Sequence, residues 1–159
     1  MLVLLLAAGC AGYRVGPTLN ADYKTVAVPM FKNKTLKPQI EAQITNAIIR
    51  RLQTDGTLKV VNEEDADLLI TGVLVDYGRG ELRSVREDTD VTREYRLTVT
   101  ARIEARNRRT GEIIVKSTDV TGSADTFIGS DLQSAEYQAL PLMADNLARK
   151  VVEMVAENW

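Results

Sequence analysis

The segment REYRLTVTARIEAR, residues 93–106, decides the fold class of this chain. Apolar and polar residues alternate strictly along it, and the apolar set is Tyr95, Leu97, Val99, Ala101, Ile103 and Ala105. Successive side chains of a strand point to opposite faces of a sheet. The alternation therefore predicts a long strand with one face in the core and the other in water.

The strand after this segment is less well defined by its sequence. The stretch NRRTG, residues 107–111, predicts a hairpin turn, so a strand over residues 112 to about 123 should run antiparallel to the first. Ile113, Ile114 and Val115 are consecutive, which breaks the alternation. The pattern therefore leaves the register of this strand open.

Shorter β-rich segments come earlier in the chain. Residues 25–29 and 58–61 predict two short strands. Residues 68–77 are apolar on both faces, which is typical of a central strand, and this strand should continue as a more polar ribbon to residue 86.

Two amphipathic helices are predicted from 3.6-residue periodicity. The first begins near Pro38 and stops at Gly56, and its apolar stripe consists of Ile40, Ile44, Ala47, Ile48 and Leu52. The second covers about residues 131–158, with a stripe of Leu140, Ala144, Leu147, Val151, Met154 and Val155. Pro141 either kinks this second helix or marks its start.

These elements predict an α+β fold with two helices packed on one face of a mostly antiparallel, four-stranded mixed sheet, in the order β-α-β-β-β-α. We expect residues 1–9 to be a signal peptide truncated at its start and residues 10–24 to be a linker to a lipid anchor. Residues 25–159 should then form one domain, as a chain of 159 residues with 45% apolar composition suggests.

Composition excludes several classes of function. A net charge of −2 provides no overall positive field, so we expect no nucleic-acid partner. The chain has no histidine and one cysteine, which excludes the common zinc sites, histidine-dependent nucleophiles and structural disulfides. We therefore expect a protein that is not an enzyme and that has no metal and no cofactor.

Cys10 follows a short apolar segment that ends in Ala7, Ala8 and Gly9. Such a segment resembles the export and cleavage signal of a bacterial lipoprotein, and it is too short to span a bilayer as a helix. Cleavage before Cys10 would leave a thiol for lipidation, which predicts a membrane contact through the N-terminal lipid. Ala11 at the next position favours retention in the outer membrane. The alternative is that the segment is a buried N-terminal strand or helix that contains one free cysteine.

Five segments together resemble the lipopolysaccharide-assembly lipoprotein family LptE. They are CAGYR (10–14), VAVPMFKNKT (26–35), IEAQITNAI (40–48), ADLLITG (66–72) and VTREYRL (91–97). The resemblance implies two helices on a four-stranded sheet, in agreement with the periodicity. It also implies a plug inside an LptD-like outer-membrane β-barrel that assists assembly of lipopolysaccharide at the cell surface.

Arginines of the central segments are the candidate binding residues for lipopolysaccharide phosphates, because the planar guanidinium can bind phosphate through two donors. The candidates are Arg83, Arg86, Arg93, Arg96, Arg102 and Arg106. The alternative is that these arginines are ordinary solvated residues paired with nearby acids such as Glu81, Glu87, Asp88, Glu94 and Glu104.

Two other functions fit the sequence. The opening VAVPMF followed by a helix also resembles periplasmic lipoproteins that regulate other envelope machines, such as activators of cell-wall synthases or curli-secretion lipoproteins. An enzyme acting through carboxylates alone is the remaining alternative, and no motif supports it.

Overall fold

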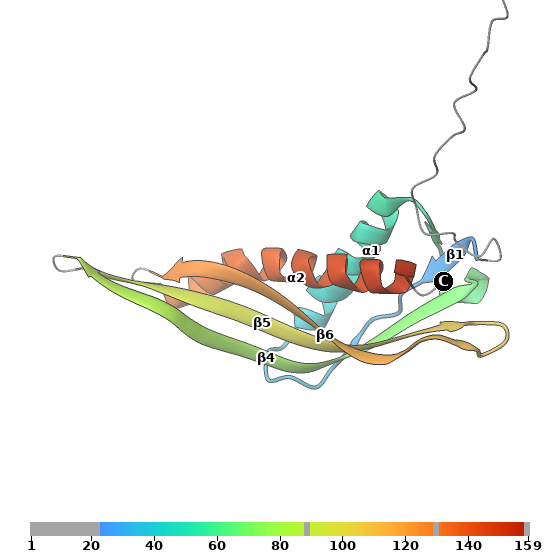
Figure 1. Cartoon of the computed structure of the whole chain (residues 1–159), viewed down its shortest axis with the longest axis horizontal. Coiled ribbons are helices and arrows are strands. Elements are labelled where there is room, and N and C mark those ends of the chain that lie inside the picture. Colours follow the sequence, from blue (N-terminus) through green and yellow to red (C-terminus); the bar gives the residue numbers. More distant parts are fainter. Residues whose placement is uncertain (1–22, 88–89, 129–130, 158–159) are drawn as a thin grey trace, which may run out of the picture.

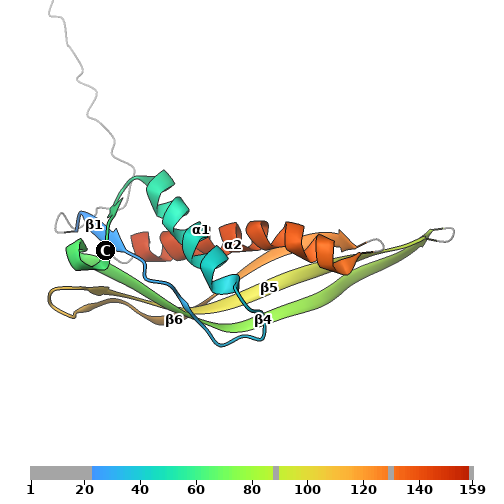
Figure 2. The same cartoon turned by 180° about the vertical axis from the view of Figure 1, so that it is seen from behind.

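The computed structural model describes residues 23–87, 90–128 and 131–157. Within these ranges it describes the backbone alone for residues 83–87, 90–93 and 128, and the side chains of all the others. Within these residues three long strands form an antiparallel meander: β4 (Leu68–Glu87), β5 (Asp90–Asn107) and β6 (Ile113–Ile128). Both α-helices, α1 (Ile40–Asp55) and α2 (Leu132–Glu157), lie on the same face of this sheet (Figures 1 and 2). The predicted α+β fold is confirmed.

The alternating segment forms β5 as predicted. Its apolar residues Leu97, Val99, Ala101, Ile103 and Ala105 are 0–1% exposed. β4 also extends through the predicted polar ribbon and pairs with β5 from Leu68 opposite Asn107 to Glu87 opposite Asp90. The hairpin between them extends beyond the helices, as Figure 2 shows.

The register of β6 explains why its sequence does not alternate. Ile103 lies opposite Thr118 and Ala105 opposite Val115, whereas Arg106 lies opposite Ile113, so the ladder shifts twice within a few residues. Irregularities of this kind change which residues face the core. β6 is also longer than predicted, because it continues to Ile128.

The described part of the sheet has six strands rather than the predicted four. β1 (Thr25–Ala27) pairs in parallel with β3 (Lys59–Val60) and β4, and β2 (Lys32–Asn33) pairs in parallel with β4. A short 3₁₀ helix, η1 (Glu63–Asp65), precedes β4. β1 and β3 lie within the segments predicted as short strands, residues 25–29 and 58–61, whereas β2 was not predicted, because two residues carry no periodicity.

Asp67 ties the first short strand to the long meander. Its Oδ2 accepts hydrogen bonds from the backbone N–H of Lys24 at 3.0 Å and of Thr25 at 3.1 Å, and from the Thr25 hydroxyl at 2.9 Å. These bonds, with the positive charge of Arg109 nearby, lower the pKa of Asp67 despite partial desolvation. The carboxylate thus holds the start of β1 beside the start of β4.

Two of the helix ends, the C-terminus of α1 and the N-terminus of α2, follow ordinary capping rules. α1 ends at Gly56, which has a φ of 72° and donates its N–H to the Leu52 carbonyl at 3.1 Å. Asp131 caps α2 by accepting from the N–H groups of Gln133 and Ser134 at 3.0 and 3.3 Å. Pro141 lies inside α2, so the alternative that it marks the helix start is wrong.

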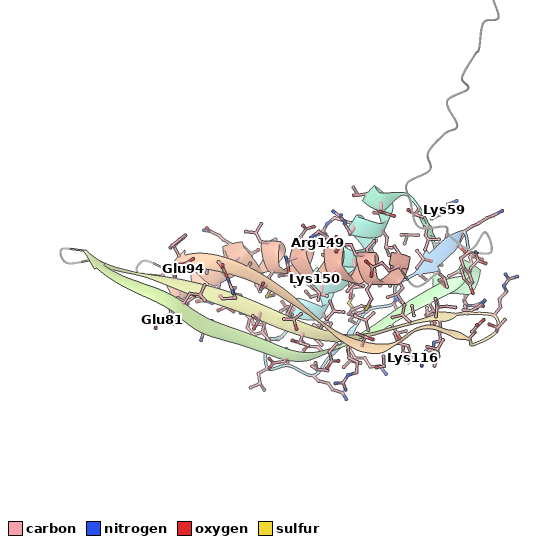
Figure 3. All side chains as sticks on the ribbon, in the orientation of Figure 1. Lys59, Glu81, Glu94, Lys116, Arg149 and Lys150 are labelled. Carbon is pink, nitrogen blue, oxygen red and sulfur yellow. The ribbon has the colours of Figure 1, made fainter. Side chains whose placement is uncertain are left out.

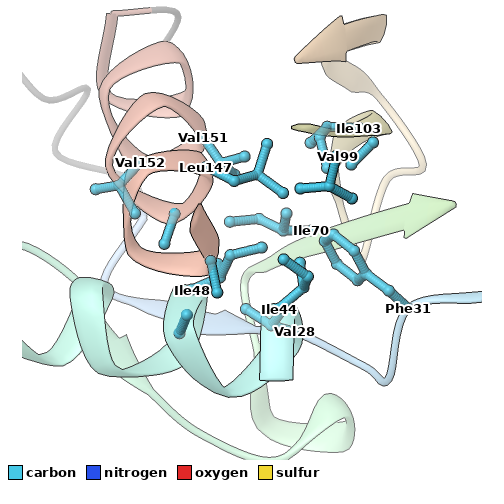
Figure 4. Packing of buried hydrophobic residues seen from close by; sticks show 14 of the residues in the cluster. Val28, Phe31, Ile44, Ile48, Ile70, Val99, Ile103, Leu147, Val151 and Val152 are labelled. Carbon is cyan, nitrogen blue, oxygen red and sulfur yellow. The ribbon is translucent and has the colours of Figure 1, made fainter. Parts of the chain in front are cut away.

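One continuous core fills the space between the helices and the sheet (Figure 4). Ile44 and Ile48 of α1, Leu147 and Val151 of α2 and Ile70 of β4 are all fully buried. Burial of each such side chain contributes roughly 1.5–3 kcal/mol, so this interface supplies most of the stability of the domain.

Gly122 sets how closely α2 approaches β6. A Cβ at this position would lie 2.6 Å from the Leu147 Cβ and 2.9 Å from the Leu147 backbone N and Cα. On either side, Asn146 accepts the N–H of Ser123 at 3.1 Å and Lys150 donates to the Thr121 carbonyl at 2.7 Å. Lys150 lies between α2 and β6 in Figure 3.

We therefore predict that Gly122→Ala destabilises the domain, because the helix backbone must move to admit one methyl group. Overpacking of this kind costs about 1–3 kcal/mol, measured here as the free energy of unfolding in urea. The control is Gly80→Ala, whose Cβ meets nothing within 4 Å. Equal unfolding free energies for the two variants would contradict the close-contact explanation.

Candidate functional site

The outer face of the sheet, which points away from the helices, carries a row of cross-strand ion pairs. Arg96 binds Asp125 through Nε and Nη2 at 2.6 and 2.8 Å, and Arg102 binds Asp119 through the same atoms at 2.7 and 3.0 Å. Hydrogen bonding and the opposite charge raise the pKa of each arginine and lower that of each aspartate. Both pairs are therefore charged at neutral pH.

These pairs bear on the predicted arginines. Arg96, Arg102 and Arg106 lie on the outer face as expected, and Arg106 Nε is 4.0 Å from Glu104, one of the predicted acidic neighbours. Asp119 and Asp125 were not predicted as partners. Their positions depend on the irregular register of β6, which the sequence pattern left open.

The remaining three candidates belong to the β4–β5 hairpin. In the backbone register Arg83 lies opposite Glu94, Arg86 opposite Val91 and Arg93 opposite Ser84. The side chains of these arginines lie outside the described part of the structure, as does Cys10.

A recess of about 390 Å³ opens on the outer face beside the β1–β2 connection. Arg102, Arg106 and Lys32 contribute positive charge to its wall, and Leu69 and Val73 contribute apolar surface; Pro29, Met30, Glu63, Thr71, Gly72, Glu104 and Ser117 complete the lining. This combination of cations and apolar surface suits an anionic group attached to an apolar body.

A second charged cluster lies on the helix side of the sheet and is centred on Glu136. Its carboxylate accepts from Lys37 Nζ at 2.6 Å, from the Tyr77 hydroxyl at 2.5 Å and from Arg79 Nη1 at 3.1 Å. Glu136 is only 7% exposed, whereas the side chains of Lys37 and Arg79 are 34% and 45% exposed. The cluster joins α2, β4 and the segment before α1.

Two opposing effects act on the pKa of Glu136. Burial raises it, but hydrogen bonds from Lys37 and Tyr77 and the charges of Lys37 and Arg79 outweigh burial and lower it overall. For Tyr77, burial and the neighbouring carboxylate both raise the pKa. The cluster at neutral pH thus contains one carboxylate, two cations and a neutral phenol.

Sequence reasoning found no partner for Glu136, although a signal was present. Glu136 precedes Leu140 by four residues and therefore belongs to the apolar stripe of α2, where an unpaired carboxylate would be costly. The position predicts a cationic partner but not which residue supplies it, because Lys37 is 99 residues away.

The described residues contain no group of three or more acidic, histidine or cysteine side chains able to hold a metal ion. Among the same residues, no helix is long and apolar enough to cross a membrane. The structure thus describes an α+β domain with two charged recesses, one on each face of its sheet.

Solved structures with the same fold come from several bacteria. CT253 of Chlamydia trachomatis is similar with a TM-score of 0.57 and 12% identity, covering 86% of this chain and 97% of that one. A minor lipoprotein of Acinetobacter baumannii has a TM-score of 0.50 and 17% identity, with 86% and 94% covered. The PelC dodecamer of Paraburkholderia phytofirmans has a TM-score of 0.51 and 16% identity, with 89% and 92% covered.

These similarities establish the class of the protein, an α+β domain of the fold shared by these bacterial proteins. The family model for LptE, lipopolysaccharide-assembly, matches residues 23–155. The chain therefore belongs to the LptE family, as its sequence motifs indicated. No curated protein matches the chain by sequence comparison.

We predict that Glu136→Gln destabilises the domain at neutral pH by about 2 kcal/mol, because hydrogen bonds to charged groups contribute ~1.5–3 kcal/mol and partial exposure screens them. Glu153→Gln is the control, since its pair with Arg149 is exposed and spans one helical turn. That substitution should cost at most about 0.5 kcal/mol.

The pH dependence gives the same prediction a second test. Folding lowers the pKa of Glu136, so its ionised form contributes to the free energy of unfolding. This contribution is complete above the ordinary glutamate pKa of about 4.3 and is lost as the pH falls through the lower pKa of the folded state. The free energies of unfolding in urea of the wild type and of Glu136→Gln should therefore become equal as the pH falls below about 4. A constant difference down to pH 2 would contradict an ionic role.

Proposed function

We propose that this chain is an outer-membrane lipoprotein that assists an LptD-like β-barrel in assembling lipopolysaccharide at the cell surface. The single observation that carries the proposal is the LptE family match over residues 23–155, which covers nearly all of the predicted domain. Cys10, placed after an apolar segment, supplies the lipid-attachment point that such a protein requires. Its role is binding and support rather than catalysis.

The character of the outer face supports a place in a water-lined barrel. The outward positions of β5 whose side chains are described are Glu94, Arg96, Thr98, Thr100, Arg102, Glu104 and Arg106, all charged or hydroxyl-bearing. The lumen of a large outer-membrane barrel is polar, so a protein within it needs a polar exterior. Cross-strand ion pairs keep these long side chains ordered.

Lipopolysaccharide phosphates would bind to arginines on this face. We keep Arg83, Arg86, Arg93, Arg96, Arg102 and Arg106 as the candidate set, and the outer-face recess favours Arg102 and Arg106 within it. Arg102 would exchange part of its bond with Asp119 for the phosphate, while Leu69 and Val73 offer apolar surface beside it.

A large outer-membrane barrel is the expected partner of this chain. A C-terminally tagged full-length chain, purified from outer membranes in mild detergent, should recover an LptD-like barrel in equal amount, and depletion of the chain should cause lipopolysaccharide to accumulate in the inner envelope. Recovery with a cell-wall synthase instead, or normal surface lipopolysaccharide after deletion, would assign the chain to the regulatory lipoproteins.

The second prediction concerns the arginines. Arg102→Gln combined with Arg106→Gln should weaken binding of purified lipopolysaccharide to the full chain several-fold, measured by titration at fixed ionic strength. Arg50→Gln combined with Arg149→Gln is the matched control, because it removes two positive charges from exposed arginine side chains of the helices. An equal loss of affinity in the control would mean that the effect depends on net charge alone and not on the position of the arginines.

A further inference from the structure

The segment from Asn33, the last residue of β2, to Gln39, just before α1, presents an apolar side chain entirely to solvent. Leu36 is 102% exposed, the highest value among the exposed large apolar residues of the described structure. Exposure of a leucine in a flexible loop would need no explanation, but this segment is held in one conformation by many bonds.

Side-chain bonds of Asn33 organise the segment. Its Oδ1 accepts from the Thr35 N–H at 2.9 Å and the Thr35 hydroxyl at 2.8 Å, and its Nδ2 donates to the Lys37 carbonyl at 2.8 Å and to Glu41 at 2.7 Å. The Lys34 N–H donates to the Leu74 carbonyl of β4 at 3.0 Å.

The end of the segment is strained. Gln39 has a φ of 65°, the one positive φ of a non-glycine residue in the described chain. A bulky residue in the left-handed region is uncommon, and such strain concentrates at sites of function. The segment that exposes Leu36 is thus both tied down by side-chain bonds and strained at its end.

Leu36 stands at the rim of the recess formed by the Glu136 cluster. The recess has a volume of about 460 Å³ and is lined by Leu36, Lys37, Tyr77, Arg79 and Glu136. Lys37 and Arg79 carry two positive charges and Glu136 carries one negative charge, so the lining of the recess has one surplus positive charge. Arg79 uses Nη1 for Glu136, and its Nε and Nη2 donate to none of the described residues.

We propose that this segment is a membrane-contact site, at which Leu36 enters the interface of a phospholipid bilayer while Arg79, Lys37 and Lys34 bind anionic headgroup phosphates. The charge is complementary, because basic side chains near an anionic surface favour binding. The inference goes beyond the proposed function and is independent of it.

The surroundings favour a lipid surface over a protein partner. Protein–protein binding depends on a packed apolar and aromatic centre, whereas Tyr77 is the one other residue with a large apolar body in the recess lining. One leucine with a few cations gives weak binding by itself, but it suffices to orient a domain that is already anchored. Residues 11–22, between Cys10 and the domain, span up to about 40 Å when extended, which permits both contacts.

The test places an environment-sensitive fluorophore at the leucine. In the full chain with Cys10→Ala, the variant Leu36→Cys is labelled with NBD and mixed with phosphatidylcholine vesicles containing 30% phosphatidylglycerol. The matched control carries the label at Leu142→Cys, an exposed leucine of α2 with 63% exposure. Because the label reports its own surroundings, vesicle binding by the apolar N-terminus does not produce the signal.

We expect a blue-shifted, at least two-fold brighter emission from the label at position 36 and no change at position 142. The change should be absent with pure phosphatidylcholine, and adding Lys34→Gln should weaken it several-fold, whereas Lys59→Gln, at another exposed lysine, should not. No emission change at position 36, or an equal change at position 142, overturns the proposal. An equal emission change at position 36 with inorganic phosphate and no vesicles assigns the site to free anions and also overturns the proposal.

Discussion

The burial of one face of the β4–β5–β6 meander beneath two helices is the constraint on which the rest of the structure depends. β5 is the central strand of the three, and its inward residues from Leu97 to Ala105 are almost completely buried. Alternation along β5 places its charged and hydroxyl-bearing side chains on the other face, where β4 adds apolar surface at Leu69 and Val73. The helices cover the sheet closely because Gly122 lets the backbone of α2 approach β6.

The two faces use charge differently. On the outer face, Arg96 and Arg102 are bound to aspartates across the strands. The paired side chains are 39–54% exposed, so these pairs organise side chains more than they stabilise the fold. On the helix side, Glu136 is nearly buried and its bonds to Lys37, Tyr77 and Arg79 connect three segments. Partial desolvation makes this second cluster the more important one for stability, and its surplus cation makes it available for an anionic ligand.

Family membership and the charge distribution are both consistent with a protein that binds amphiphilic anions. The LptE match covers the domain from its first described residue to the end of the apolar stripe of α2. In the part of the chain that the structure describes, neither face holds three or more acidic, histidine or cysteine side chains grouped so that they could bind a metal ion. Both recesses instead combine cations with apolar surface, an arrangement suited to binding amphiphilic anions.

Sequence alone determined the α+β class, the extents of α1 and β4 to within a few residues, and the buried face of β5, because each depends on a periodic pattern within one segment. Tertiary structure decided the parallel pairing of β1, β2 and β3, since strands of two or three residues have no pattern of their own. It also decided the partners of the candidate arginines and of Glu136. Asp119 faces Arg102 because of shifts in the β6 ladder, and Lys37 meets Glu136 across 99 residues of chain. Such contacts follow from how the segments pack against one another, and no local sequence pattern contains that information.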